Sequence, residues 1–160
     1  MSIYVIAEIG PNHNGDLALA RDMVRRLSDT GVDAVKFQLS IPGNVYSADA
    51  YKADYQKTND GEGSPLDMAR RIQLPARDHL ILAEDCRTVG LDYMCTAFDI
   101  DSLRFLDDNI EMPYFKIASG EIFSADTLDF MARRDRPILL STGMASFKDI
   151  KAALTLLEVE

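Results

Sequence analysis

The sequence predicts an α/β fold built on a parallel sheet. Short apolar runs alternate with segments whose apolar residues recur at the helical period, and five such pairs follow one another along 160 residues. Parallel strands need helical crossovers that bury the sheet, which accounts for the nearly unbroken apolar character of the runs. The expected strands are Tyr4–Ile9, Ala34–Gln38, Asp92–Thr96, Tyr114–Ile117 and Pro137–Ser141.

The intervals between these runs carry the start and stop signals of helices. Asp16 is expected to cap the first helix, and Gly31 lies where that helix should end. Ser146, with Asp149 three residues later, is expected to cap the last helix. The remaining helices are expected to begin at Pro75 and stop before Gly90, and to cover Asp101–Asn109 and Thr127–Arg133.

Two architectures accommodate five βα units. One is a flavodoxin-like doubly wound sheet, for which 160 residues is about complete. The other is the first five-eighths of a TIM (β/α)8-type barrel, which needs about 250 residues. Length alone favours the doubly wound sheet, and the periodicity of the apolar residues does not distinguish the two architectures. A long insertion, residues 39–74, is typical of a functional or disordered loop, and Ser64 to Ile72 is expected to form a short helix within it.

Composition excludes several classes of protein. With a net charge of -9, the chain has no excess of positive charge that could neutralise the phosphates of a nucleic acid, which argues against nucleic-acid binding. No apolar run reaches the roughly 18 residues that span a bilayer, and the opening run from Ile3 resembles a strand and not a signal peptide. Cys86 and Cys95 are the only cysteines, which argues against a disulfide framework and favours a reducing cytoplasm.

Polar side chains recur where nearly every expected strand ends. Because ligands bind at the carboxyl ends of parallel strands, these residues are candidates for one site. Lys36 and Lys116 each interrupt an apolar strand, and a buried ammonium is costly unless an anion or a carboxylate such as Glu8 faces it. Two lysines at matching strand ends favour a site for a phosphate and a carboxylate. The polar strand-end residues are Glu8, Asn12–Asn14, Lys36, Gln38, Thr96, Lys116, Ser119, Glu121, Ser141 and Thr142.

Glu8 and Glu121 are the candidate acid/base groups, although each taken alone is more often a structural partner. His13 follows a strand end, so a site role and a turn-stabilising role remain open. His79 on a helix is more typical of a packing or surface residue, and Cys95 of a core residue. The sequence contains no CxxC, HExxH, GxGxxG or P-loop pattern, which argues against structural zinc and dinucleotide binding.

Four motifs carry a family resemblance. Residues Ile6–Asp16 (IAEIGPNHNGD) resemble the opening of the NeuB-type sialic acid synthases, which include N-acetylneuraminate, legionaminate, pseudaminate and spore-coat synthases. The segments Lys36–Gln38, Lys116–Glu121 and Leu140–Met144 are similar to three further signatures of that family in the same order. The resemblance extends from about Tyr4 to Ser146, which is nearly the whole chain.

The resemblance implies the TIM barrel and not the doubly wound sheet. Residues 1–160 would form the N-terminal portion of the barrel domain, without its last three strands and without the C-terminal antifreeze-like domain. It also implies an enzyme that condenses phosphoenolpyruvate with an N-acetylated hexosamine-type aldehyde to give a nonulosonic acid and phosphate, in surface polysaccharide biosynthesis. The full-length form would be a homodimer, and this portion alone is expected to be inactive.

Motif positions imply the roles of individual residues. Glu8 and Glu121 would flank the reacting centre as catalytic groups. The family uses Mn²⁺ or Mg²⁺, but its histidine ligands lie on later strands, so the sequence assigns no metal ligand here. The segment 55–61 resembles the legionaminate and neuraminate branches more than the pseudaminate branch. The implied substrate-binding residues are Lys36, Lys116, Ser119 and Asn59 for phosphoenolpyruvate, with Gln38, Thr96 and Ser141 lining the site.

Two other functions fit the derived site. In a Schiff-base aldolase, Lys36 or Lys116 would be the nucleophile. The other is a flavodoxin-like binding or regulatory module without catalytic activity.

Overall fold

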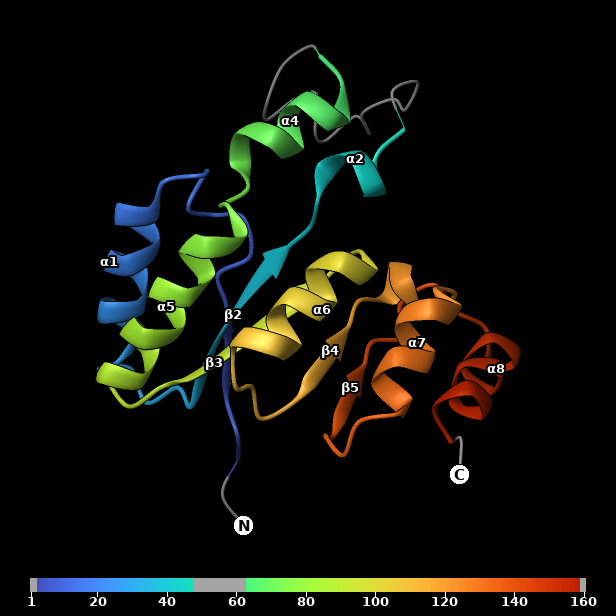
Figure 1. Ribbon diagram of the computed structural model, residues 1–160. Helices are drawn as coiled ribbons and strands as arrows, with labels where there is room; N and C mark the ends of the chain where they lie inside the picture. Colours follow the sequence, from blue (N-terminus) through green and yellow to red (C-terminus); the bar gives the residue numbers. More distant parts are fainter. Residues whose placement is uncertain (1–2, 48–62, 159–160) are drawn as a thin grey trace.

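The computed structural model describes residues 3–47 and 63–158. Five parallel strands form one sheet in the order β1-β2-β3-β4-β5, so every strand pairs with its neighbours in the sequence (Figure 1). The strands are β1 (Ile6–Glu8), β2 (Ala34–Leu39), β3 (Asp92–Ala97), β4 (Phe115–Ile117) and β5 (Ile138–Leu140).

The crossover helices form one layer along this sheet. Helices that follow consecutive strands contact one another, from α1 through α5, α6 and α7 to α8 (Figure 1). A doubly wound sheet would reverse its strand order and divide its helices between two faces. The arrangement is therefore five consecutive units of a barrel, and the preference based on length alone was wrong because length carries no information on strand order. The helices are α1 (Leu17–Leu27), α5 (Ala76–Thr88), α6 (Ile100–Asn109), α7 (Ala125–Ala132) and α8 (Phe147–Leu157).

The helix caps are confirmed. The Asp16 carboxylate accepts hydrogen bonds from the amides of Ala18 and Leu19, at 2.8 and 3.2 Å, and so satisfies two free donors at the start of α1. Ser146 and Asp149 form a capping box at the start of α8. Within the described ranges, no helix combines the length and apolar character needed to cross a membrane.

The insertion after β2 contributes the short helices α2 (Pro42–Val45) and α4 (Pro65–Ile72), the second of which was expected from the sequence. Two contacts anchor α4 beside the strand ends. The side chain of Gln73 accepts from the Ser40 amide at 3.2 Å and donates to the Ser40 hydroxyl at 2.5 Å. Gly15 has φ +76°, and a Cβ there would lie 2.4 Å from the carbonyl oxygen of Arg71, so only glycine permits this close approach.

Strand β1 is shorter than the sequence predicts, since it begins at Ile6 and not at Tyr4. The amide of Val5 donates to the Asp33 carboxylate at 2.6 Å and not to a backbone carbonyl of the neighbouring strand. Strand β5 begins at Ile138 because Pro137 has no amide hydrogen, although its carbonyl accepts from Phe115 at 2.9 Å.

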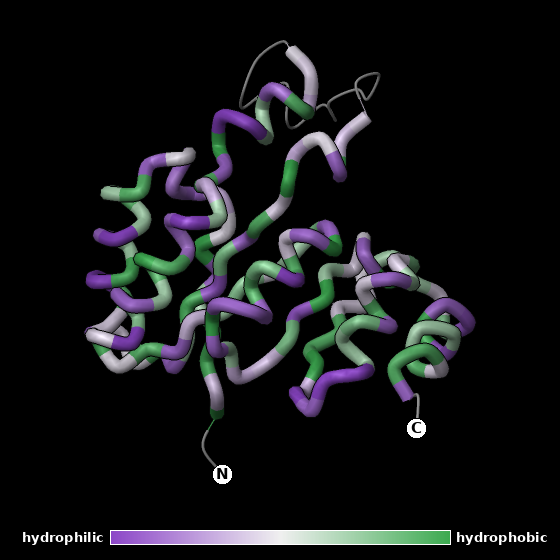
Figure 2. The backbone as a smooth tube through the Cα atoms, in the orientation of Figure 1, coloured by the Kyte–Doolittle hydropathy of each residue, from purple (hydrophilic) through white to green (hydrophobic). Residues whose placement is uncertain are grey.

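The core lies between the sheet and its helices. Phe37 has no exposed surface, stacks on Tyr93 with ring centroids 5.6 Å apart, and meets the ring of His79 on α5 edge-on at 6.1 Å. Since side chains alternate across a strand, the neighbours of Phe37, Lys36 and Gln38, point to the opposite face. We call that face, turned away from the helices, the inner face. Figure 2 shows how hydrophilic and hydrophobic residues follow one another along the backbone.

Candidate active site

The register of the sheet gathers five of the predicted site residues on its inner face. Glu8 pairs with Lys36, Gln38 pairs with Thr96, and Thr96 pairs with Lys116. Directly paired residues of parallel strands point to the same face, so these side chains share the inner face of β1 to β4 on two successive levels of the register. A hydrogen bond from Lys36 to Thr96 links the two levels, and we call this group of five side chains the lysine row.

Lys36 lies at the centre of this row. Its side chain is 10% exposed, its ammonium forms an ion pair with the carboxylate of Glu8, and it donates to the hydroxyl of Thr96 at 3.0 Å. Both alternatives that the sequence left open for Lys36 are therefore compatible with the structure. Glu8 satisfies the charge, yet its own side chain is 47% exposed, so an incoming anion has access to the pair.

Lys116 provides the second positive charge. Its ammonium donates to the Ser141 hydroxyl at 2.7 Å and to the Ile117 carbonyl at 2.5 Å. Burial lowers the pKa of Lys116, the charge of Lys36 lowers it further, and the Glu8 carboxylate partly opposes both effects. Because the charge of Lys36 acts on Lys116, the two ammonium groups form a local positive centre in an otherwise acidic chain, which is suited to an anion.

Two glycines fit closely against the predicted site residues. A Cβ on Gly10 would lie 3.0 Å from a carboxylate oxygen of Glu8 and 3.2 Å from the amide nitrogen of Gln38, so these two side chains meet over the Gly10 backbone. A Cβ on Gly143 would lie 3.3 Å from the hydroxyl of Ser119, which places Ser119 beside the loop that follows β5.

Gly10 provides a test of this packing. Its φ is +50°, so Gly10→Ala is expected to destabilise the fold by about 1 kcal/mol through backbone strain, and to displace Glu8 and Gln38. Urea denaturation measures the first effect. Gly43→Ala is the matched control, because a Cβ there meets nothing within 4 Å, and equal stability losses in the two variants would contradict the argument.

Glu121 lies apart from the lysine row. It ends the 3₁₀ turn Ser119–Glu121, and its carboxylate accepts from the Ser124 hydroxyl at 2.6 Å. The side chain lines a separate hollow at the carboxyl edge of the sheet. Spacing alone did not reveal this division of the Lys116–Glu121 motif between two sites. Asn59, the remaining predicted residue, lies outside the described residues.

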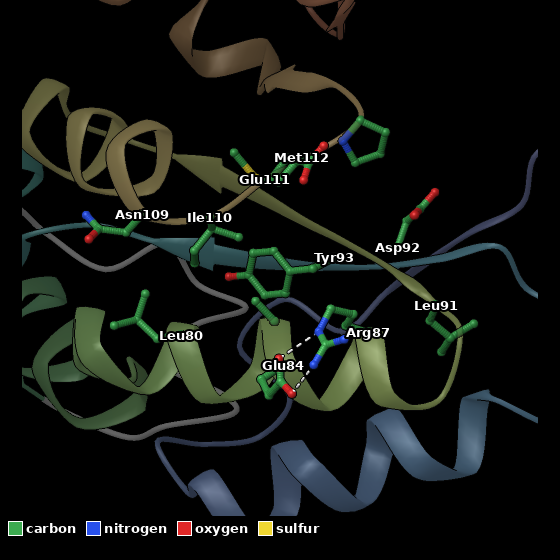
Figure 3. A pocket seen from close by; sticks show the side chains of 12 residues that line it. Leu80, Glu84, Arg87, Leu91, Asp92, Tyr93, Asn109, Ile110, Glu111 and Met112 are labelled. Carbon is green, nitrogen blue, oxygen red and sulfur yellow. Dashed lines mark hydrogen bonds and ion pairs between the residues drawn. The ribbon is translucent and has the colours of Figure 1, made fainter.

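A larger hollow lies at the other end of the sheet. Figure 3 shows it between α5 and the strands, where Glu84 and Arg87 form an ion pair with a hydrogen bond of 2.8 Å. Its lining includes Asp92, the first residue of β3, and residues 109–113, which precede β4. It therefore lies at the amino ends of the strands, which in barrels contribute stability and not catalysis.

Comparison with known proteins assigns the family. The model of the NeuB family matches residues 23–160, which is most of the chain. The chain belongs to the NeuB family.

Several relatives of the NeuB family align along nearly all of this chain. It is 37% identical to the N,N'-diacetyllegionaminic acid synthase of Legionella pneumophila over 155 residues, which are 96% of this chain and 43% of that protein. The synthase of the same name from Campylobacter jejuni is 38% identical, covering 96% and 46%. Human N-acetylneuraminate-9-phosphate synthase is 28% identical, covering 92% and 41%. The chain thus spans less than half the length of these relatives.

Solved structures agree with the NeuB assignment. An N-acetylneuraminic acid synthetase from Leptospira borgpetersenii superposes with a TM-score of 0.84 at 25% identity, covering 99% of this chain and 50% of that one. A phospho-2-dehydro-3-deoxyheptonate aldolase from Thermotoga maritima, at 14% identity and TM-score 0.65, shares the fold. The barrel architecture implied by the four motifs is confirmed.

The histidines and Cys95 serve packing in this NeuB-family chain. His13 is 2% exposed, and its Nδ1 accepts from the Gly15 amide at 3.1 Å, which supports the turn-stabilising alternative. His79 is fully buried, with Nδ1 2.6 Å from the Tyr93 hydroxyl. Burial raises the pKa of the Cys95 thiol to about 12, so the thiol stays protonated, as a core residue should.

Sequence reasoning missed Asp99, which follows the end of β3. Its buried carboxylate accepts from the Ile41 amide at 2.7 Å and from Ser102 at the start of α6, and so joins the insertion after β2 to the next unit. Asp99 lies two residues after the end of β3, and this position could have identified it, because the other candidates were identified by their positions at strand ends.

Proposed function

We propose that this chain holds the phosphoenolpyruvate-binding part of a synthase that condenses phosphoenolpyruvate with an N-acetylated hexosamine-type aldehyde. The products are a nonulosonic acid, for surface polysaccharide biosynthesis, and phosphate. The observation that supports it most is the pair of lysines on the inner face of β2 and β4, with Thr96 of β3 between them. Phosphoenolpyruvate carries a phosphate and a carboxylate, and each lysine would neutralise one of these groups.

The neighbours of the lysines suit this role. The hydroxyls of Thr96 and Ser141 hold the two ammonium groups in place, at 3.0 and 2.7 Å. A bound anion would become a further acceptor for each ammonium, and it would compete with Glu8 for Lys36. Ser119 and Gln38 lie along the same edge and would donate hydrogen bonds to the ligand. For Asn59, the same role rests on the family resemblance alone.

In the proposed reaction, every bond formed or broken and every proton transferred is accounted for by the two substrates, water and the site residues. Carbon 3 of phosphoenolpyruvate bonds to the aldehyde carbon, whose oxygen takes a proton, and positive charge develops at carbon 2. Water adds to carbon 2 and loses a proton, and the tetrahedral adduct then releases phosphate by cleavage of its C–O bond. Glu8, once a ligand anion occupies Lys36, is the group placed to position that water or accept its proton. The lysine charges stabilise the phosphate and carboxylate throughout.

The divalent metal that the family resemblance implies does not fit the described residues. Within 3–47 and 63–158, no group of three or more His, Cys, Asp or Glu side chains could hold a metal ion. His13 and His79 are packed with Phe37 on the opposite face of β2 from the lysines. No step is therefore assigned to a metal here.

The lowered pKa of Lys116 keeps a Schiff-base aldolase as the second candidate, because such enzymes require a neutral lysine. One experiment separates the two. The protein at its full natural length, supplied with a divalent cation, is incubated with phosphoenolpyruvate and N-acetylmannosamine or a 2,4-diacetamido-hexose, and inorganic phosphate is measured. In parallel, it is treated with pyruvate and borohydride and examined by mass spectrometry. Acceptor-dependent phosphate release without a lysine adduct is the expected result, and an adduct on Lys116 or Lys36 without phosphate release would establish the aldolase.

A further inference from the structure

The two lysines of the lysine row have partners of different charge. The ammonium of Lys116 donates to the Ser141 hydroxyl and the Ile117 carbonyl, which are neutral, and no carboxylate of the described residues forms an ion pair with it. The ammonium of Lys36 instead pairs with the carboxylate of Glu8. Before a ligand binds, the charge of Lys36 is therefore neutralised within the site, whereas Lys116 has no anionic partner in direct contact.

In the pair of Lys36 and Glu8, the lysine is fixed and the glutamate is the partner that can leave. The Lys36 side chain is largely buried, lies in β2 between two neighbouring strands, and is also held by the Thr96 hydroxyl at 3.0 Å. The Glu8 side chain is about half exposed at the end of β1, and among the described residues only Lys36 forms an ion pair or hydrogen bond with its carboxylate. Separating the pair is therefore cheap on the side of Glu8, because water already reaches this carboxylate.

A neutral donor lies on the other side of the Glu8 carboxylate. Oε2 of Glu8 pairs with Lys36, while Oε1 lies 3.0 Å from the position of a Cβ on Gly10. The same position is 3.2 Å from Nε2 of Gln38, so Glu8 and Gln38 meet over a residue that has no side chain. A carboxylate that leaves Lys36 thus still faces the amide of Gln38, which donates hydrogen bonds but carries no charge.

We infer that Glu8 is a displaceable counter-ion, which neutralises Lys36 in the empty site and gives up its place to an anionic group of the donor substrate. This inference rests on the proposed function, in which the phosphate and the carboxylate of phosphoenolpyruvate each need one lysine. Glu8 then opposes the binding of phosphoenolpyruvate although it belongs to the site, because the ligand separates the pair and lies beside a further negative charge. Glu8 is also released to act on water only while the donor substrate is bound.

Glu8→Gln tests the inference, because glutamine keeps the size of the side chain and an acceptor for Lys36 but has no charge. The protein at its full natural length, with a divalent cation, is titrated with phosphoenolpyruvate in a calorimeter. The variant is expected to bind phosphoenolpyruvate about tenfold more tightly than the unaltered protein. A residue that holds the ligand directly would weaken binding when replaced, so the sign of the change distinguishes the two roles. Calorimetry gives the stoichiometry separately from the Kd, so an unfolded fraction does not imitate a change in affinity.

Two further variants complete the test. Glu8→Ala removes the same carboxylate and is expected to tighten binding as well, so the result does not depend on one variant. Glu84→Gln is the matched control, because it removes a negative charge from an ion pair with Arg87, beside the hollow at the amino ends of the strands, and is expected to leave the Kd unchanged.

The outcomes separate this inference from the proposed function. Equal or weaker binding in the Glu8 variants overturns the inference and leaves the proposed function intact, because the unaltered protein still binds phosphoenolpyruvate. A gain in Glu84→Gln as large as that in Glu8→Gln also overturns it, because the cause would then be the net charge of the chain. If neither the unaltered protein nor the Glu8 variants bind phosphoenolpyruvate, the proposed function fails, and this inference with it.

Discussion

Replacing Lys116 by alanine is expected to weaken the binding of phosphoenolpyruvate by about a hundredfold or more. The variant removes one of two positive charges from a partly buried site, where a charge-assisted hydrogen bond to phosphate or carboxylate is worth about 2–5 kcal/mol. It leaves the hydroxyl of Ser141 without its charged partner, but a hydroxyl alone cannot balance the ligand's charge. Isothermal titration calorimetry with phosphoenolpyruvate measures the loss directly.

Two companion variants separate charge from packing in this experiment. Lys116→Met keeps most of the side-chain volume, so it is expected to lose binding as completely as alanine does. Lys151→Ala removes a lysine from the exposed side of α8 and is expected to bind phosphoenolpyruvate like the unaltered protein. Unchanged affinity in Lys116→Ala would remove Lys116 from the site, and with it the main support for the proposed function.

Acid is expected to destabilise the fold through His79, by about 3 kcal/mol between pH about 6.5 and about 4. Burial lowers the pKa of His79 to about 4, and the charge of His13 lowers it further. In this window the unfolded chain binds a proton at the imidazole and the folded chain does not, so the free energy of unfolding falls as the pH falls and levels off below about pH 4. His13, whose pKa burial also lowers, adds to the loss in the same direction. Urea denaturation followed by circular dichroism at intervals from pH 7.5 to 4 measures the effect.

A double variant provides the control for this pH dependence. His79→Phe combined with Tyr93→Phe removes both members of a buried hydrogen bond, which costs less than removing one of them. The acid-induced loss should then shrink by the share due to His79, while titrating carboxylates still contribute. An identical pH dependence in the double variant would show that His79 is not the titrating group.

The side chains at the strand ends could be predicted because they depend on local pattern. Lys36, Gln38, Thr96 and Lys116 stand in short apolar runs, and the alternation of side chains along a strand determines which of them share a face. The caps Asp16 and Ser146 were equally predictable, since a cap is a contact between residues two or three positions apart.

Features that depend on long-range pairing could not be predicted from the pattern. Strand order is a property of partners such as Ala34 and Asp92, far apart in the chain, so only the family motifs distinguished the barrel from the doubly wound sheet. The place of His13, in the turn after β1, depends on its contact with Phe37 of β2. The roles assigned to Glu8, Glu121 and the lysines stay predictions until the variants are measured.

The alternation in β2 has a consequence for how the chain finds its fold. Val35 and Phe37 point under the helices, and Lys36 between them points to the inner face. A slip of one residue in this strand would carry the ammonium into the apolar core and expel an aromatic ring from it, at a cost of several kcal/mol. Lys36 therefore disfavours misaligned pairings of β2 during folding, in addition to the role proposed for its charge in ligand binding.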